Sequence, residues 1–148
     1  MTATTARDGT RTPSIEPLVE IPEKYRDLFE RPIVVSLATV LPDGQPQVTP
    51  VWCDLHEGHI RVNTAQGRRK HRDMVERPQV TVMALDPDNP FRYVEVRGRV
   101  VQITEEGADA HIDALAKQYL GVDRYPNHSD QETRVTCVIA PRLISAMG

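Results

Sequence analysis

Short runs of β-branched residues that end at turn signals dominate the first half of this chain. Residues 33–41 run into Pro42-Asp43-Gly44, residues 47–56 run into Glu57-Gly58, and residues 59–64 follow. Pro presets one turn dihedral, Asp hydrogen-bonds to nearby backbone, and Gly accepts a positive φ, so these residues close tight turns. The pattern therefore predicts three strands joined by two hairpins.

Three later runs have the same character and complete the expected sheet. Strands are predicted over residues 79–86, 92–104 and 133–140, the last of them ending before Pro141. Along residues 92–104 polar and apolar side chains alternate, and Gly98 suggests a bend or a bulge. Six strands ordered mainly as hairpins favour an antiparallel barrel, so the predicted fold class is mainly β with flanking helices.

Three helices are expected around the strands, over residues 23–30, 68–76 and 105–120. The second lies between Gly67, which permits the turn from strand to helix, and Pro78, which stops it. The third begins with acidic side chains, carries apolar ones at helical spacing and ends at a glycine.

A chain of 148 residues has the size of one domain. Residues 1–20 contain few large apolar side chains, so we expect a flexible N-terminal tail and a single domain over residues 21–148. Cys53 and Cys137 lack the CxxC spacing of a redox or metal site and are expected as buried thiols. Because no targeting segment and no apolar run of membrane-spanning length occurs, we expect a cytoplasmic protein that does not bind membranes.

Positive charge is concentrated in one segment. Residues 61–77 contain six of the eighteen Lys and Arg residues, although the formal net charge of the chain is −3. Backbone N–H groups at a helix start, together with guanidinium groups, form a site suited to a phosphate. By itself this segment is also compatible with a solvated helix face or a local nucleic-acid patch. The acidic overall balance argues against nucleic-acid binding.

Several classes of catalytic site are not supported by the sequence. It contains no GxSxG elbow, and neither a GxGxxG nor a GxxxxGK[ST] loop. Its five histidines are scattered and no HExxH or Cys cluster occurs, so no metal site is expected. No catalytic side chain is assigned.

Four segments resemble the flavin/deazaflavin split β-barrel superfamily of pyridoxamine 5'-phosphate oxidase-like proteins, in particular its actinobacterial F420-dependent reductase branch. These segments are residues 34–52, 61–74, 93–100 and 115–121. The resemblance implies a six-stranded antiparallel split β-barrel of the FMN-binding type. It also implies a homodimer with the cofactor at the subunit interface.

The resemblance further implies which residues bind the cofactor. The strand end and basic turn that hold the phosphate correspond to Asn63, Thr64, Arg68, Arg69 and Lys70. The strand along the flavin or deazaflavin ring corresponds to Val48, Thr49, Pro50, Val51 and Trp52. A proline in that strand fits this role, because Pro lacks a donor and is placed at an edge, a bulge or beside a ligand.

Two departures from pyridoxamine 5'-phosphate oxidases decide the expected substrate and cofactor. Gln47 and Trp52 stand where those enzymes carry basic residues, and residues 142–144 lack their Arg-x-His motif. The resemblance therefore implies an oxidoreductase that uses reduced coenzyme F420 to transfer a hydride to an unsaturated or conjugated small-molecule acceptor. The alternatives are an FMN-dependent enzyme of the same fold and a non-catalytic carrier of a deazaflavin or haem. Residues 86–92 and 121–132 are expected to wall the substrate pocket.

Overall fold

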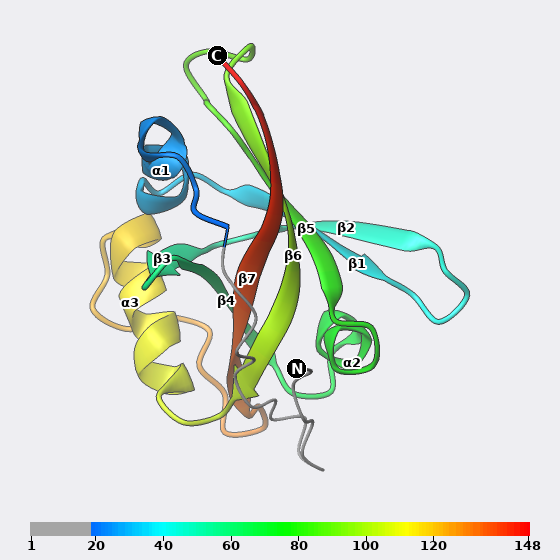
Figure 1. The fold of residues 1–148 in the computed structure, drawn as a ribbon. Coiled ribbons are helices and arrows are strands. Elements are labelled where there is room, and N and C mark those ends of the chain that lie inside the picture. Colours follow the sequence, from blue (N-terminus) through cyan, green and yellow to red (C-terminus); the bar gives the residue numbers. More distant parts are fainter. Residues whose placement is uncertain (1–18) are drawn as a thin grey trace.

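The structure, a computed structural model, describes residues 19–148, and this part of the chain contains three helices and seven strands (Figure 1). The expected flexible tail, residues 1–20, lies almost entirely outside the described residues. The helices are α1 (Glu23–Glu30), α2 (Arg69–Glu76) and α3 (Ala108–Leu120). The strands are β1 (Val35–Val40), β2 (Pro46–Val51), β3 (Asp54–His56), β4 (His59–Ala65), β5 (Gln79–Leu85), β6 (Tyr93–Thr104) and β7 (Arg134–Met147).

All strands belong to one antiparallel sheet with the order β2-β1-β5-β6-β7-β4-β3. The long strands β6 and β7 run through its middle, the β1–β2 hairpin projects on one side, and β3, β4 and α3 lie on the other (Figure 1). The predicted mainly β split barrel with flanking helices is confirmed. Pro50 lies on β2, an edge strand of this sheet, where a missing N–H group is tolerated.

The expected count of six strands is wrong, because residues 47–56 form two strands. β2 pairs with β1 at one edge of the sheet, whereas β3 pairs with β4 at the other edge. The chain leaves β2 after Val51 and crosses to the opposite edge through Trp52 and Cys53. One continuous strand cannot pair at both edges, so the run is interrupted between them.

The expected end of the last strand before Pro141 is also wrong, because β7 continues to Met147. Arg97 pairs with Leu143 and Gly98 pairs with Pro141, so Arg142 is an extra residue on β7. Such a β-bulge accommodates a residue that cannot donate to the ladder, and it bends the strand. The bend expected at Gly98 therefore occurs as a bulge in the opposite strand.

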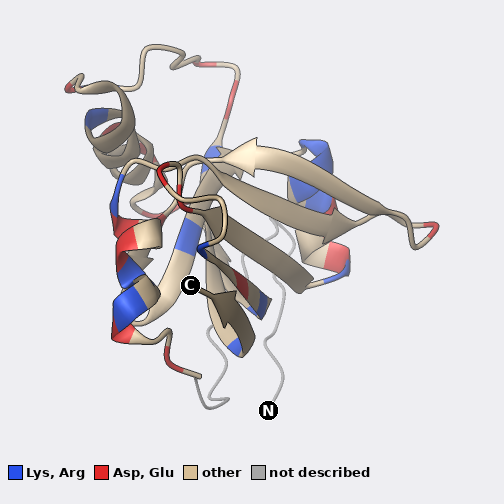
Figure 2. Ribbon diagram, turned by 90° about the horizontal axis from the view of Figure 1, so that it is seen from above, with Lys and Arg blue, Asp and Glu red and all other residues tan. Residues whose placement is uncertain are grey.

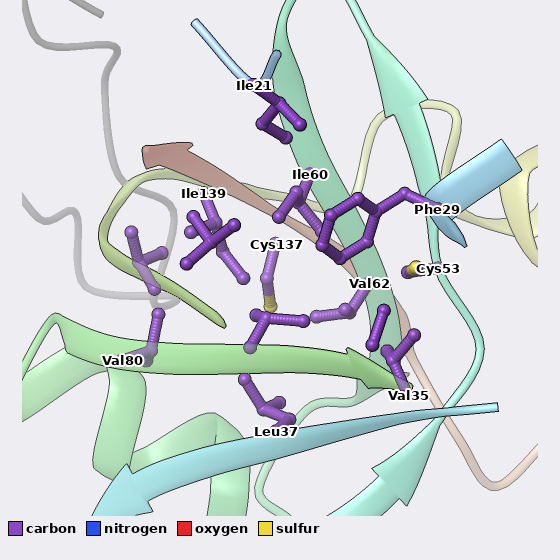
Figure 3. Close-up of a cluster of buried hydrophobic side chains, with 14 of the residues drawn as sticks. Ile21, Phe29, Val35, Leu37, Cys53, Ile60, Val62, Val80, Cys137 and Ile139 are labelled. Carbon is purple, nitrogen blue, oxygen red and sulfur yellow. The ribbon is translucent and has the colours of Figure 1, made fainter. Parts of the chain in front are cut away.

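A single core of apolar side chains fills the barrel (Figure 3). Phe29 of α1, Leu37 of β1 and Ile139 of β7 belong to this core, and all three are fully buried. Cys53 and Cys137 are free thiols within this core, as expected, and burial raises the pKa of each to about 12. Both thiols are therefore protonated and behave as small apolar side chains.

The helices cover the barrel with the faces that their apolar spacing indicates. Tyr25, Leu28 and Phe29 of α1 are buried. The third helix begins at Ala108 rather than Glu105, because Gly107 adopts a left-handed conformation at its N-cap. None of the helices in residues 19–148 is long and apolar enough to cross a membrane.

Candidate functional site

A pocket of about 400 Å³ lies where the end of β2, the end of β4, the start of α2 and helix α3 meet. We call it the α2–α3 pocket. Its lining residues are Val34, Pro50, Val51, Trp52, Asn63, Arg68, Lys70, Ile112, Leu115, Tyr125, Asn127 and Arg134. This lining combines basic, aromatic, amide and aliphatic side chains, a composition expected of a small-molecule site.

The basic side of this pocket contains Arg68, Lys70 and Arg134. Glu132 pairs with Nη2 of Arg68 and lies 3.3 Å from Nη1 of Arg134. These partners, Arg68 first, lower the pKa of Glu132. Lys70 forms no hydrogen bond or ion pair with any residue in the described part of the chain. Three cations thus face one carboxylate, and the pocket carries an excess of positive charge.

Lys70 is held at this place by the turn into α2. Gly67 has a φ of 87°, which a residue with a side chain rarely adopts, and its N–H donates to Nδ1 of His71 at 3.0 Å. Arg68 is the N-cap of α2, and its side chain does not cap the backbone N–H groups of the first turn. Figure 2 shows that Lys and Arg residues gather on α2. Guanidinium, ammonium and helix N–H groups therefore share one corner.

Asn63 connects this basic corner with the interior. Its Oδ1 accepts a hydrogen bond from Nε of Arg134 at 2.9 Å. Its Nδ2 donates to the Ala108 carbonyl at 2.9 Å and to Nδ1 of His111 at 3.1 Å. Because Nδ1 of His111 accepts, the neutral ring carries its proton on Nε2, which lies 3.2 Å from Oδ2 of Asp54. The amide orientation that holds Arg134 is thus set by buried groups.

Asp54 on β3 closes the far end of this network. Its carboxylate accepts from Nε and Nη2 of Arg61 at 2.9 and 2.8 Å. Burial by itself raises the pKa of Asp54, but hydrogen bonds from His111 and Arg61 outweigh it and lower the pKa to about 2. The carboxylate is therefore charged at neutral pH and anchors both partners.

Trp52 and Tyr125 form the aromatic side of the α2–α3 pocket, and Tyr119, which is outside the lining, supports Trp52. The Trp52 ring stacks on Tyr119 with centroids 5.2 Å apart and 15° between the planes, and Tyr125 meets Trp52 edge-on at 6.2 Å. The guanidinium of Arg134 lies 5.2 Å from the centroid of the Tyr125 ring. The Tyr119 hydroxyl accepts the Cys53 N–H at 3.1 Å, and burial raises its pKa. This wall is suited to a planar ring with a nearby negative charge.

A loop over residues 121–133 carries Tyr125 and Asn127 to the pocket. Oδ1 of Asp113 on α3 accepts from the Tyr125 N–H at 2.8 Å and lies 2.7 Å from Nε2 of His128. The hydrogen bond from Tyr125, and then that from His128, lowers the pKa of Asp113. One charged carboxylate thus fixes the part of the loop that completes the aromatic wall.

The structure brings together six of the ten residues implied by the resemblance. Those that line the pocket are Pro50, Val51, Trp52, Asn63, Arg68 and Lys70. The other four lie outside its lining: Val48 is exposed on β2, Thr49 neighbours it, Thr64 is buried in β4, and Arg69 pairs with Asp73 at 2.7 Å. Cofactor binding by all ten remains a prediction.

The residues that sequence reasoning missed are mostly on elements far along the chain. They are Val34, Ile112, Leu115 and Arg134. The expected wall over residues 121–132 does supply Tyr125 and Asn127, whereas residues 86–92 do not line this pocket. One feature could have predicted that Arg134 lies at the pocket: it is the first residue of the last strand and pairs with Ala65 at the end of β4. Pairing those two strands would have placed it beside the basic turn.

Chemically, the pocket offers groups that can bind an anion and a ring. Its described lining contains no Ser, Cys, Asp or Glu. Within residues 19–148 no group of three or more His, Cys, Asp or Glu side chains is placed to hold a metal ion. The arrangement can orient a flat, anionic ligand and shield one face of it from water.

Comparisons with known proteins assign this chain to a family. A family model described as pyridoxamine 5'-phosphate oxidase matches residues 21–148. The solved structure of an F420 reductase is 38% identical, with 84% of this chain and 98% of that chain covered and a TM-score of 0.77. No curated protein matches the chain.

Two further solved structures share the fold at low identity. The conserved hypothetical protein Rv2991 from Mycobacterium tuberculosis is 22% identical, with 97% of this chain and 89% of that chain covered and a TM-score of 0.70. HutZ, described as the haem storage protein from Vibrio cholerae, is 14% identical, with 88% and 96% covered and a TM-score of 0.62. The family model spans nearly all of the described residues, and the F420 reductase is similar over most of both chains. The chain therefore belongs to the pyridoxamine 5'-phosphate oxidase family.

Proposed function

We propose that this protein is an oxidoreductase that binds reduced coenzyme F420 in the α2–α3 pocket and passes its hydride to an unsaturated or conjugated small-molecule acceptor. The observation that carries the proposal is Lys70, a half-buried ammonium group without a partner among the described residues. Burial lowers the pKa of Lys70, and the nearby charges of Arg68 and Arg134 act in the same direction. A bound anion would act in the opposite direction, because a nearby negative charge favours the charged ammonium group.

A phosphate fits the groups that surround Lys70. Arg68 and Arg134 stand on the same side of the pocket, and the uncapped first turn of α2 adds backbone N–H donors. Guanidinium groups grip two phosphate oxygens at once, while an ammonium group acts as a point charge. The residues present are therefore suited to a cofactor that ends in a phosphate.

The aromatic side of the pocket suits the ring of such a cofactor. Trp52 is fixed by its stack on Tyr119, and Pro50 presents no N–H group that would need a partner. The reduced coenzyme itself supplies the hydride, so the protein contributes binding and orientation. Protein groups would hold the ring beside Trp52, exclude water with Ile112 and Leu115, and neutralise the phosphate.

A deazaflavin is preferred to FMN for two reasons. The pocket holds three cations, which suits a cofactor with an anionic tail beyond its phosphate. The protein described as an F420 reductase is also similar to this chain over 98% of its own length. FMN remains the alternative cofactor of the same pocket, and a carrier of deazaflavin or haem remains the alternative without turnover.

We further propose a homodimer in which the partner covers the open side of this pocket. The side chains on the outer face of β1 and β2 form a stripe that is largely apolar and exposed, which we call the hairpin stripe. Its members include Val34 and Val48, which are 55% and 63% exposed, together with Pro46 and Pro50. Val34 and Pro50 also line the α2–α3 pocket. A second copy packed on the stripe would thus border the cofactor.

A binding titration tests this function. The fluorescence of coenzyme F420 should change saturably with added protein, and Lys70→Gln should weaken binding about tenfold or more, since a charged hydrogen bond contributes roughly 1.5–3 kcal/mol. Lys117→Gln, on the exposed side of α3, is the matched control and should bind as the wild type does. Absence of saturable binding at micromolar protein would exclude F420. A yellow preparation with flavin absorbance would indicate FMN, and a Soret band on adding haem would indicate a carrier.

A further inference from the structure

A second hollow of about 450 Å³ lies on the outer face of the sheet and shares no lining residue with the α2–α3 pocket. We call it the arginine hollow. It is lined by Ala38, Thr39, Val40, Pro46, Gln79, Val80, Thr81, Arg97, Gly98, Arg99 and Arg142. Three arginines from two neighbouring strands therefore face one cavity, and no carboxylate lines it in the described part of the chain.

The strand geometry explains why these arginines meet. Arg97 and Arg99 are two residues apart on β6, so their side chains lie on the same face of the sheet. On β7 the bulge leaves Arg142 as the extra residue opposite the step from Arg97 to Gly98. A Cβ on Gly98 would lie 2.7 Å from Cγ2 of Ile139 and 2.8 Å from the Ala140 carbonyl oxygen, so the close approach of β6 and β7 requires glycine. Bulges of this kind redirect side chains and are frequent at functional sites.

The charge of the hollow is incompletely balanced. Arg97 donates from Nε to Glu95 at 3.0 Å, and both side chains are partly exposed to solvent. Arg99 has no hydrogen bond or ion pair with any described residue, and its Nε is buried. A buried charged donor without an acceptor is unfavourable, whereas an anion placed beside it gains a charge-assisted hydrogen bond.

Part of the remaining lining is apolar. Ala38 and Val40 of β1 and Pro46 of β2 contribute side chains without hydrogen-bonding groups. From this combination we infer that the arginine hollow binds a small organic anion, in which a carboxylate or phosphate contacts Arg99 and an apolar body lies against β1 and β2. Within one copy this site shares no lining residue with the proposed cofactor pocket, and the inference does not depend on the cofactor assignment.

A carboxylate of a second protein copy is the competing occupant, because the hollow borders the hairpin stripe at Pro46. The two sources differ in what they require. A free anion binds saturably from solution and leaves the oligomeric state unchanged. A partner side chain fills the hollow only in the dimer, so loss of Arg99 would then weaken dimerisation.

The experiment uses hexanoate, inorganic phosphate and 1-hexanol as probes, with the backbone amides of Gly98 and Thr81 followed by heteronuclear NMR. Hexanoate is expected to shift both amides saturably, and phosphate to shift them in the same direction with lower affinity. Hexanol has the apolar body without the anion and is expected to have little effect. In Arg99→Gln the dissociation constant for hexanoate should rise about tenfold or more.

Matched variants separate binding from folding. Arg72→Gln removes an exposed arginine of α2 that lines neither cavity, and it should leave hexanoate binding unchanged. Arg97→Gln gives a second test if Arg99→Gln unfolds, and it should also weaken binding. Equal affinity in the wild type and the Arg99 and Arg97 variants overturns the proposal, as does an equal effect of hexanol. Sedimentation showing a weaker dimer in Arg99→Gln, with no probe binding to the wild type, overturns it in favour of a partner carboxylate.

Discussion

At the scale of single residues, the basic corner of the pocket depends on side chains that do not line it. Asp54 holds His111, His111 fixes the amide of Asn63, and that amide holds Arg134 against the pocket. Each step is a short contact between polar side chains that are buried or partly buried. The orientation of Arg134 is thus a consequence of a carboxylate on a distant edge strand.

Asp54→Asn should change how stability depends on pH. The pKa of Asp54 is about 2 in the folded protein and ordinarily 3.8. A lowered folded-state pKa means that the charged form stabilises the fold above pH 3.8, and this contribution is lost as the pH falls towards 2. We expect Asp54→Asn to lower the free energy of unfolding by roughly 1–2 kcal/mol at neutral pH, after allowance for solvent screening.

Urea unfolding of both proteins at several pH values between neutral and 2 measures this effect. Other carboxyl groups with lowered pKa values, including Asp27 and Asp113, weaken the wild type over the same range. The quantity to compare is therefore the difference between wild type and variant, which should shrink as the pH falls. Asp130→Asn, in an exposed part of the 121–133 loop, should show no such difference. A difference in the free energy of unfolding that stays constant with pH would contradict the proposed stabilisation by the charged Asp54 carboxylate.

At the scale of elements, local patterns predicted most strands and helices because alternation, turn residues and helix stops act over a few positions. The two errors in the strands arose where tertiary pairing decides. Residues 47–56 form a continuous β-prone run, but β2 and β3 pair at opposite edges of the sheet. Pro141 indicates a strand end locally, yet a bulge against Gly98 lets β7 continue. Neither pairing can be read from the chain alone.

The residues of the candidate site also fall into two groups, those that local sequence patterns predict and those that long-range contacts bring to the pocket. Pro50, Trp52 and Lys70 lie on segments whose resemblance to known proteins is local, and the structure places them together. Tyr125 and Arg134 come from a loop and a strand start far along the chain. They reach the pocket through Asp113 and through the pairing of β7 with β4, which are long-range contacts. Sequence patterns do not contain that information.

The loop over residues 121–133 should loosen when its tie to α3 is removed. Asp113→Ala deletes the acceptor of the Tyr125 N–H and the partner of His128. We expect faster hydrogen exchange at the Tyr125 amide and stronger acrylamide quenching of Trp52, because Tyr125 no longer covers the edge of that ring. Global stability should change little, since the Asp113 side chain is 28% exposed and lies outside the core.

The matched control for this loop is Asp130→Ala, which removes an exposed carboxylate from the same segment. Its exchange and quenching should equal those of the wild type. Trp52 is the single tryptophan of the chain, so the quenching signal reports on the pocket directly. If Asp113→Ala leaves both measurements unchanged, the loop is held by other contacts.

At the scale of the whole molecule, the hairpin stripe is an apolar surface whose exposure a single copy of the chain does not explain. The β1–β2 hairpin projects from the body of the protein in Figure 1, and Val48 and Pro50 on its outer face are exposed. A contiguous apolar surface beside a binding pocket is typical of an interaction site. Val34 and Pro50, which are exposed members of the stripe, also line the α2–α3 pocket.

Val48→Asp tests the proposed dimer, because it places a charge in the stripe without touching the core. Val48 is 63% exposed, so the substitution should leave the melting temperature of the fold nearly unchanged. Burying the new carboxylate against a second copy without a partner would be strongly unfavourable, and the mass from light scattering should fall from two chains towards one. Val122→Asp, which is 38% exposed after α3, should keep the wild-type mass. If Val48→Asp remains dimeric, the two copies meet at another surface. If the variant is monomeric and binds F420 more weakly, the partner completes the pocket. A monomeric variant with unchanged F420 affinity would rule out a contribution of the partner to the pocket.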